Sequence, residues 1–275
     1  MGTSTGTSTG MTMFDYDFMR TAFAASGVVA VVAGIVGVFL VGRSQTFAGH
    51  ALSHVGFAGA TAAGLMGISP LGGMIVFTLV AGVGMGLLGE RLSGRDVAIG
   101  IVLALSLGFG LLFLHFYTSF ATQATALLFG NVLAVSPDTL RTLVILGVVT
   151  LAALAVISRP LLFATLQPEL AEARGVSHRL IGTLFMAIVA LTVSASVQIV
   201  GILLVFTLMV GPAAAAERLT TRLGAGIALA AGLAVAEAWV GITIAFYSDW
   251  PTSFCITTLS ALIYFAAIAI AYRRR

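Results

Sequence analysis

Lysine is absent from this 275-residue chain, and cysteine occurs once, at Cys255. A Walker-type phosphate-binding loop needs a lysine after its glycines, and a Schiff base needs an amine. The chain therefore cannot hydrolyse ATP through a Walker site. A single cysteine also excludes an intrachain disulfide and a thiolate metal cluster within one copy.

Charged residues are scarce as well. They make up 8% of the chain, against 59% hydrophobic residues, which is more apolar surface than a soluble domain can bury. The net charge of +3 comes from arginines in the polar connections and not from a basic face, so a nucleic-acid partner is not expected. We expect the membrane lipid to be the solvent of this chain.

The apolar stretches predict an all-α polytopic membrane bundle. A spanning helix needs about 20 predominantly apolar residues, and nine stretches approach that length. A tenth, 124–135, is too short to cross and is expected to form a re-entrant helix. The nine stretches are 22–42, 47–67, 71–89, 97–116, 140–157, 180–197, 201–216, 223–246 and 254–272.

The N-terminal residues form a Gly/Ser/Thr/Met string with too little apolar content to order itself, and they lack the basic segment of a signal peptide. We therefore expect residues 1–19 to be a disordered tail and residues 20–275 to form one transmembrane domain. A lysine-free composition rich in Ala, Gly, Val and Arg indicates a GC-rich genome. The expected location is a prokaryotic plasma membrane, crossed many times.

The arginines predict the orientation, because cytoplasmic loops are enriched in basic residues. Nine crossings that start outside leave only Arg20 and Arg141 on the outer side. The arginines that then fall inside are Arg43, Arg91, Arg95, Arg159, Arg174, Arg179, Arg218, Arg222 and Arg273 to Arg275.

One long polar loop, 158–179, is expected on the cytoplasmic side. It contains the segment QPELAEARG at 167–175, with proline and glutamate at its start and arginine and glycine at its end, which is the signature of a short helix. Two interpretations stay open: an ordinary amphipathic connector, or a coupling helix that docks on an ATPase.

His50 and His54 are four residues apart in the second predicted span, so both imidazoles lie on one helix face, with Ser53 and Thr61 on or beside it. Neutral imidazole suits Zn, Cu, Fe and Ni, and a polar group in the hydrocarbon is costly unless it is used. We predict that the two histidines, called the imidazole pair below, bind a metal. The alternative is a structural role, with one histidine at the interface and the other in an interhelical hydrogen bond.

Glu237 and Pro212 are the other polar or irregular positions inside predicted spans. Glu237 is the carboxylate near the middle of a span, where an ionised group costs about 2.5–3.5 kcal/mol on insertion scales. It either lines the pathway as a ligand or proton-coupled group, or is protonated and hydrogen-bonded to a neighbouring helix. Pro212 breaks regular helix geometry, and the kink is either a gating hinge or a packing bend.

Four segments together resemble the zinc/manganese/iron ABC-3 family of permeases, the membrane subunits of metal importers. They are GHALSHVGFAG at 49–59, LLFGNVLAVS at 127–136, QPELAEARGV at 167–176, and VQIVGILLV at 197–205 followed by GPAAAA at 211–216. The likeness runs from about residue 41 to the end.

This resemblance implies a homodimeric permease that binds a dimer of ATP-binding subunits and receives metal from an extracytoplasmic binding protein. ATP hydrolysis is then expected in the partner, and no cofactor is bound permanently. The family's second-helix aspartate and histidine are pore ligands: His54 matches the histidine, and His50 stands where the family usually has aspartate. The positions implied in ATPase coupling are Gln167, which replaces the family's usual aspartate, and Pro168, Glu169, Ala171 and Gly175.

Imidazole in place of carboxylate favours Zn, Fe, Co or Ni over Mn, so we expect zinc as the transported ion, followed by manganese or iron. A stand-alone secondary transporter with Glu237 as its proton-coupling acid is the alternative. An intramembrane zinc hydrolase is a remote third, because the chain has no HExxH motif and no carboxylate beside the pair.

Overall fold

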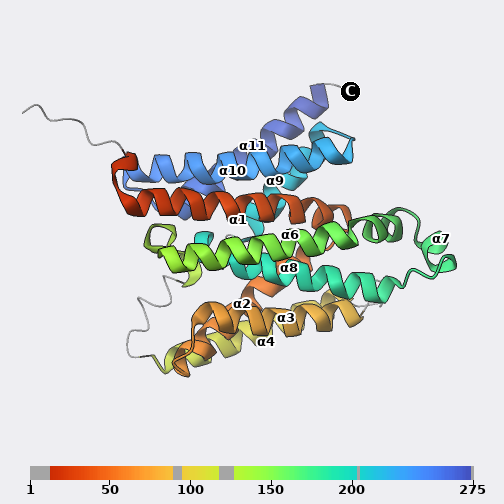
Figure 1. Cartoon of the computed structure of the whole chain (residues 1–275), viewed down its shortest axis with the longest axis horizontal. Coiled ribbons are helices and arrows are strands. Elements are labelled where there is room, and N and C mark those ends of the chain that lie inside the picture. Colours follow the sequence, from red (N-terminus) through yellow and green to blue (C-terminus); the bar gives the residue numbers. More distant parts are fainter. Residues whose placement is uncertain (1–12, 89–94, 118–126, 203–204, 274–275) are drawn as a thin grey trace, which may run out of the picture.

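The computed structural model describes residues 13–88, 95–117, 127–202 and 205–273, and the regular elements in these ranges are helices (Figure 1). This confirms the all-α membrane bundle. Two short 3-10 helices, η1 (Met13–Asp15) and η2 (Val132–Ala134), accompany the α-helices. The α-helices are α1 (Asp17–Gly42), α2 (Thr46–Leu65), α3 (Pro70–Leu88), α4 (Arg95–His115), α6 (Pro137–Leu166), α7 (Pro168–Ala173), α8 (His178–Val200), α9 (Val205–Leu219), α10 (Leu223–Ser248) and α11 (Thr252–Arg273).

The nine longer helices follow the nine predicted spans in order. Seven of those in the described ranges are long and apolar enough to cross a membrane by length and composition: α1, α3, α4, α6, α8, α10 and α11. Helices α9 and α2 are not among these seven. Helix α9 has only 15 residues, and α2 carries both histidines of the pair, which lower its hydropathy. Both lie among the other helices, where neighbours replace lipid as the surroundings.

Two groups of helices are joined through the middle of the bundle. In one, α2 packs on α3, α4 and α8; in the other, α9 packs on α1, α10 and α11. Helices α1 and α8 have the highest buried share of the seven candidate spans, 61% and 72%, and they contact each other and α6. Small residues permit the close packing: the Cα of Gly59 on α2 lies so near Gly73 on α3 that an added Cβ would overlap the Gly73 carbonyl.

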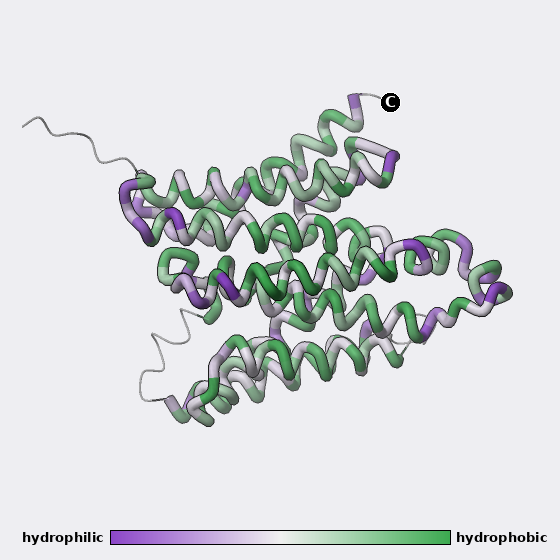
Figure 2. The backbone as a smooth tube through the Cα atoms, in the orientation of Figure 1, coloured by the Kyte–Doolittle hydropathy of each residue, from purple (hydrophilic) through white to green (hydrophobic). Residues whose placement is uncertain are grey.

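The helices alternate in direction, which places the N-terminal end of α1 and the C-terminal end of α11 at opposite ends of the bundle (Figure 1). The α1–α2 connection, the short helix α7 and the α9–α10 connection share one end, and Arg43, Arg174 and Arg222 cap helices there. Hydrophilic colouring gathers mostly at the two ends and hydrophobic colouring fills the middle (Figure 2). The excess of arginine predicts that the end with α7 is the cytoplasmic one.

The first helix begins earlier than the expected boundary of the tail. Residues 13–15 form η1, and α1 starts at Asp17 instead of after residue 19. Aromatic packing explains the difference: the rings of Phe14 and Phe23 lie 5.1 Å apart, and Tyr16 lies 6.3 Å from Phe246 on α10. The first twelve residues of the expected tail lie outside the described residues.

The polar loop is also shorter than the expected range of 158–179. Helix α6 continues through Pro160 to Leu166, so the loop begins at Gln167. Proline removes one intrahelical hydrogen bond, but Leu161 and Ala164 beyond it are 0% and 3% exposed. Burial of these apolar side chains carries the helix past the proline.

The short apolar stretch forms two helical turns instead of one re-entrant helix in its described part. Residues 127–129 are helical, Gly130 adopts φ 73°, and η2 follows. The turns are fixed to their surroundings, because Ile202 N donates to Leu127 O at 3.2 Å and Ser253 Oγ donates to Phe129 O. This segment therefore packs against the α8–α9 connection and the start of α11. Residues 124–126 lie outside the described ranges.

Candidate functional site

Helix α2 lies inside the bundle, and every residue from Ala51 to Ala63 is buried. It packs on α3, α4 and α8 along most of its length and touches α9 as well. A helix with two imidazoles crosses the apolar region here because protein surrounds it in place of lipid.

The structure brings the imidazole pair together. The ring centroids of His50 and His54 lie 5.0 Å apart, with an interplanar angle of 86°. His54 is only 8% exposed and His50 is half-buried. The Nδ1 atom of each ring is buried and has no hydrogen-bond partner among the described residues. Buried polar atoms are nearly always hydrogen-bonded, so these two neighbouring nitrogens are candidate ligand atoms.

Ser53 and Thr61 lie on α2 as predicted, but both donate to their own helix. Ser53 Oγ donates to His50 O at 2.7 Å, and Thr61 Oγ1 donates to Phe57 O at 2.9 Å. The Thr61 carbonyl accepts from the Tyr117 hydroxyl at 2.8 Å, which ties the outer half of α2 to the end of α4. Neither hydroxyl bonds to an imidazole in the described part of the chain.

Glu237 does not join the imidazole pair. It is 0% exposed and lies on α10, and the described residues contain no group of three or more His, Cys, Asp or Glu side chains that could hold a metal ion. Helix α9 contacts both α2 and α10. The described residues therefore place two imidazoles at the pair and no third His, Cys, Asp or Glu side chain beside them.

Phe206 is a neighbour of the pair that the sequence did not reveal. Its ring centroid lies 5.7 Å from that of His50 at an interplanar angle of 82°. It is the second residue of α9, and Pro212 lies further along the same 15-residue helix. The only sequence signal was an aromatic residue in an apolar run, and such residues occur throughout this chain.

The predicted short helix of the polar loop is present as α7, and its boundaries follow the sequence signals. Pro168 occupies its first turn, and Gly175 adopts φ 79° just after it ends. His178 Nε2 lies 2.9 Å from Pro168 O, which fixes the loop to the start of α8. Ala171 is fully buried, whereas Glu169, Leu170 and Glu172 are exposed. Helix α7 therefore exposes Leu170 together with two acidic side chains.

One hydrogen bond and one cation–π contact, both from Arg43, join helices at this end of the bundle. Arg43, the C-cap of α1, donates from Nη1 to Thr165 Oγ1 on α6 at 2.7 Å, and its guanidinium lies 5.7 Å from the Phe185 ring on α8. The side chain thus links three helices beside α7.

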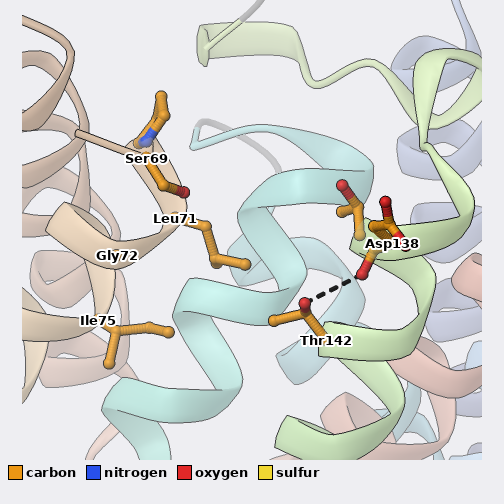
Figure 3. A pocket seen from close by; sticks show the side chains of 8 residues that line it. Ser69, Leu71, Gly72, Ile75, Asp138 and Thr142 are labelled. Carbon is orange, nitrogen blue, oxygen red and sulfur yellow. Dashed lines mark hydrogen bonds between the residues drawn. The ribbon is translucent and has the colours of Figure 1, made fainter. Parts of the chain in front are cut away.

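The opposite end of the bundle carries a pocket of about 490 Å³ between the starts of α3 and α6 (Figure 3). It is lined by Ser69, Leu71 and Ile75 from one side and by Asp138 and Thr142 from the other. Thr142 Oγ1 donates to Asp138 O at 3.0 Å, and the Asp138 carboxylate pairs with Arg141 at 3.3 Å. This pocket lies at the end opposite α7 and does not include the imidazole pair.

The alternating apolar helices, the short helix α7 at one end and the buried imidazole pair are the features of a polytopic membrane transport protein. The chain belongs to the ABC 3 transport family, whose model matches residues 15–271. It is thus a membrane permease subunit of an ABC transporter and not itself the ATPase, and the resemblance carried by the four motifs is confirmed.

The chain is similar to bacterial proteins over nearly its whole length. It is 28% identical over 260 residues to the manganese transport system membrane protein MntC of Listeria innocua, which covers 94% of this chain and 92% of that protein. It is 27% identical over 262 residues to a probable iron transport system membrane protein of Haemophilus influenzae, covering 94% and 95%. Among solved structures, PsaBC from Streptococcus pneumoniae in complex with Fab matches with a TM-score of 0.84 and 25% identity over 93% of this chain and 92% of that chain.

Proposed function

We propose that this chain is the membrane permease of an ATP-driven importer of a divalent transition metal ion, which passes the imidazole pair on α2. The observation that carries the proposal is the pair of buried Nδ1 atoms without hydrogen-bond partners, on ring centroids 5.0 Å apart. Neutral imidazole nitrogen is a ligand for such ions. Two copies related by a two-fold axis would together offer four imidazoles.

Zinc is the leading substrate on the chemistry of the pair. The permease family that the four motifs resemble usually has aspartate at the position of His50. Imidazole in its place removes a hard anionic oxygen and adds a borderline nitrogen. Manganese or iron is the second candidate. The relatives favour these metals, because MntC is named as a manganese transport protein and the Haemophilus influenzae relative as a probable iron transport protein. The His50→Asp variant should move selectivity toward manganese.

The proposed partners follow from the two ends of the bundle. An ATP-binding subunit docks on α7, where Gln167, Pro168, Glu169, Ala171 and Gly175 form the coupling contact. An extracytoplasmic metal-binding protein delivers the ion at the opposite end. Closure of the ATPases on ATP would push α7 and change the side from which the imidazole pair is accessible.

A stand-alone secondary transporter has less support. It needs a carboxyl group beside the ion to couple metal movement to protons, and Glu237 lies outside any described cluster with the pair.

Elemental analysis of cells tests the proposal. Cells that express the permease with its ATPase and binding protein are compared for Mn, Fe, Co, Ni, Cu and Zn, with the double variant His50→Ala/His54→Ala and with His115→Ala as a matched control. His115 is an exposed histidine at the end of α4, away from the pair. We expect one metal to accumulate in the wild type and the control but not in the double variant. Accumulation in all three would remove the pair from the pathway, and no accumulation in the wild type would overturn the importer.

A further inference from the structure

A buried carboxyl group on α10 lies apart from the imidazole pair and has no assigned role. Glu237 is 0% exposed, forms no ion pair among the described residues, and neither carboxyl oxygen makes a hydrogen bond of ordinary geometry there. Ser260 on α11 lies opposite it in the antiparallel register of α10 and α11. The contact between Gly241 and Ile256, one helical turn away, defines this register: an added Cβ on Gly241 would overlap Ile256.

Ser260 also touches α9, at the turn before Pro212. Its Oγ donates to Thr207 O at 3.4 Å, and an added Cβ on Gly211 would overlap that Oγ. Thr207 and Gly211 are four residues apart and therefore lie on one face of α9. Pro212 leaves the carbonyl of Leu208 without its usual helical donor, so Ser260 contacts α9 at the residue next to that carbonyl.

The other side of the same turn touches the imidazole pair. Phe206, adjacent to Thr207, packs its ring on His50 with centroids 5.7 Å apart. The first turns of α9 thus lie between a polar contact from α11 and an aromatic contact to α2. A shift of α9 would change the environment of His50 without any movement of α2.

We infer that Glu237 is a positioning residue for transport: through Ser260 it holds the turn of α9 before Pro212, and thereby keeps Phe206 against His50. The inference requires that the protonated carboxyl of Glu237 donate a hydrogen bond to Ser260 Oγ, which rotation of the two facing side chains would form; it does not require negative charge. A neutral amide of the same shape should therefore serve, whereas a methyl group should not. This inference rests on the proposed function only where metal uptake is measured; the labelling experiment does not depend on it.

The first experiment follows the position of α9 and does not depend on transport. Because Cys255 is the only cysteine and is buried, a Cys255→Ser background with Phe206→Cys gives one reactive site, at a position that is 38% exposed. Its labelling rate by a maleimide is measured in the assembled complex with Glu237→Ala, Glu237→Gln, Ser260→Ala and Thr257→Ala. Thr257 is the matched control on α11, because its hydroxyl donates only to Ser253 O of its own helix, at 2.8 Å.

We expect Glu237→Ala and Ser260→Ala each to change the labelling rate at least threefold, and Glu237→Gln and Thr257→Ala to leave it within 1.5-fold. The double variant Glu237→Ala/Ser260→Ala should change the labelling rate no more than either single variant, because the effects of two substitutions that remove the same interaction do not add. An unchanged rate in Glu237→Ala, or a multiplied effect in the double variant, would overturn the inference.

The second experiment measures metal uptake by the same complexes, with native Phe206 and Cys255, in proteoliposomes with ATP. Glu237→Ala and Ser260→Ala should lower the maximal rate at least fivefold while the half-saturating metal concentration stays within twofold, and Glu237→Gln should restore the rate to within twofold. If Glu237→Gln fails as Glu237→Ala does, the group acts through its charge or its proton, and the positioning role is wrong. If the wild-type complex takes up no metal, the proposed function fails, and the labelling rates still decide the role of Glu237.

Discussion

Gly201 joins α8 to α9 in a conformation that only glycine tolerates. Its φ of 77° and ψ of 169° lie in a region that L side chains avoid, at a cost of about 1–3 kcal/mol. An added Cβ would also overlap the backbone of Leu128, Phe129 and Gly130. Gly201→Ala therefore combines strain with a clash against a segment that cannot move freely, because it is hydrogen-bonded to Ile202 and to Ser253 on α11.

We expect Gly201→Ala to lower the free energy of unfolding by about 3 kcal/mol or more, the strain and the clash together. For a chain of this size that corresponds to a fall in Tm of roughly 6–12 °C. The assay is the thermal unfolding of the purified permease in detergent. Gly182→Ala is the matched control, since it lies in the same helix, α8, has open space where its Cβ would be, and should be neutral or stabilising by up to about 1 kcal/mol. A Tm of Gly201→Ala within 2 °C of both wild type and control would refute the reasoning.

Three further perturbations follow from the structure. Metal uptake should fall steeply below about pH 6, because protonated imidazole cannot ligate and the ordinary histidine pKa is about 6.5; uptake at pH 5 equal to that at pH 7.5 would remove the imidazole pair from the pathway. Gly59→Leu should prevent α2 from packing on Gly73 and lower the Tm by several degrees, in contrast to Gly84→Leu, whose Cβ meets open space; equal Tm values for the two variants would contradict this. Glu169→Arg, at the exposed face of α7, should weaken co-purification of the ATPase at least fivefold while the permease Tm stays unchanged; undiminished co-purification would place the docking contact elsewhere.

The helices were predictable because their signals are local. Runs of apolar residues predicted the nine longer helices of the described residues, and the spacing of four residues placed His50 and His54 on one face. The orientation that the arginines indicate stays a prediction. Proline and glycine around 167–175 marked the limits of α7 for the same reason, since they act on the backbone where they stand.

The errors arose where packing between distant segments decides. Helix α6 continues past Pro160 because Leu161 is buried against other helices, and α1 begins at Asp17 because aromatic residues contact each other and α10. The sequence alone cannot pair Phe206 with His50 or Ser260 with Glu237, because each pair is separated by many residues and neither partner has a distinctive local pattern.

X-ray absorption at the metal edge tests the central claim most directly, that the imidazole pair binds the transported ion. The purified complex is loaded with one equivalent of zinc per pair, and the ligand atoms are identified from their distances and scattering. Histidine nitrogens at about 2.0–2.1 Å should be present in the wild type, and they should be lost in His50→Ala/His54→Ala and retained in His115→Ala. A spectrum without histidine nitrogen, or one that the double variant leaves unchanged, would contradict the account.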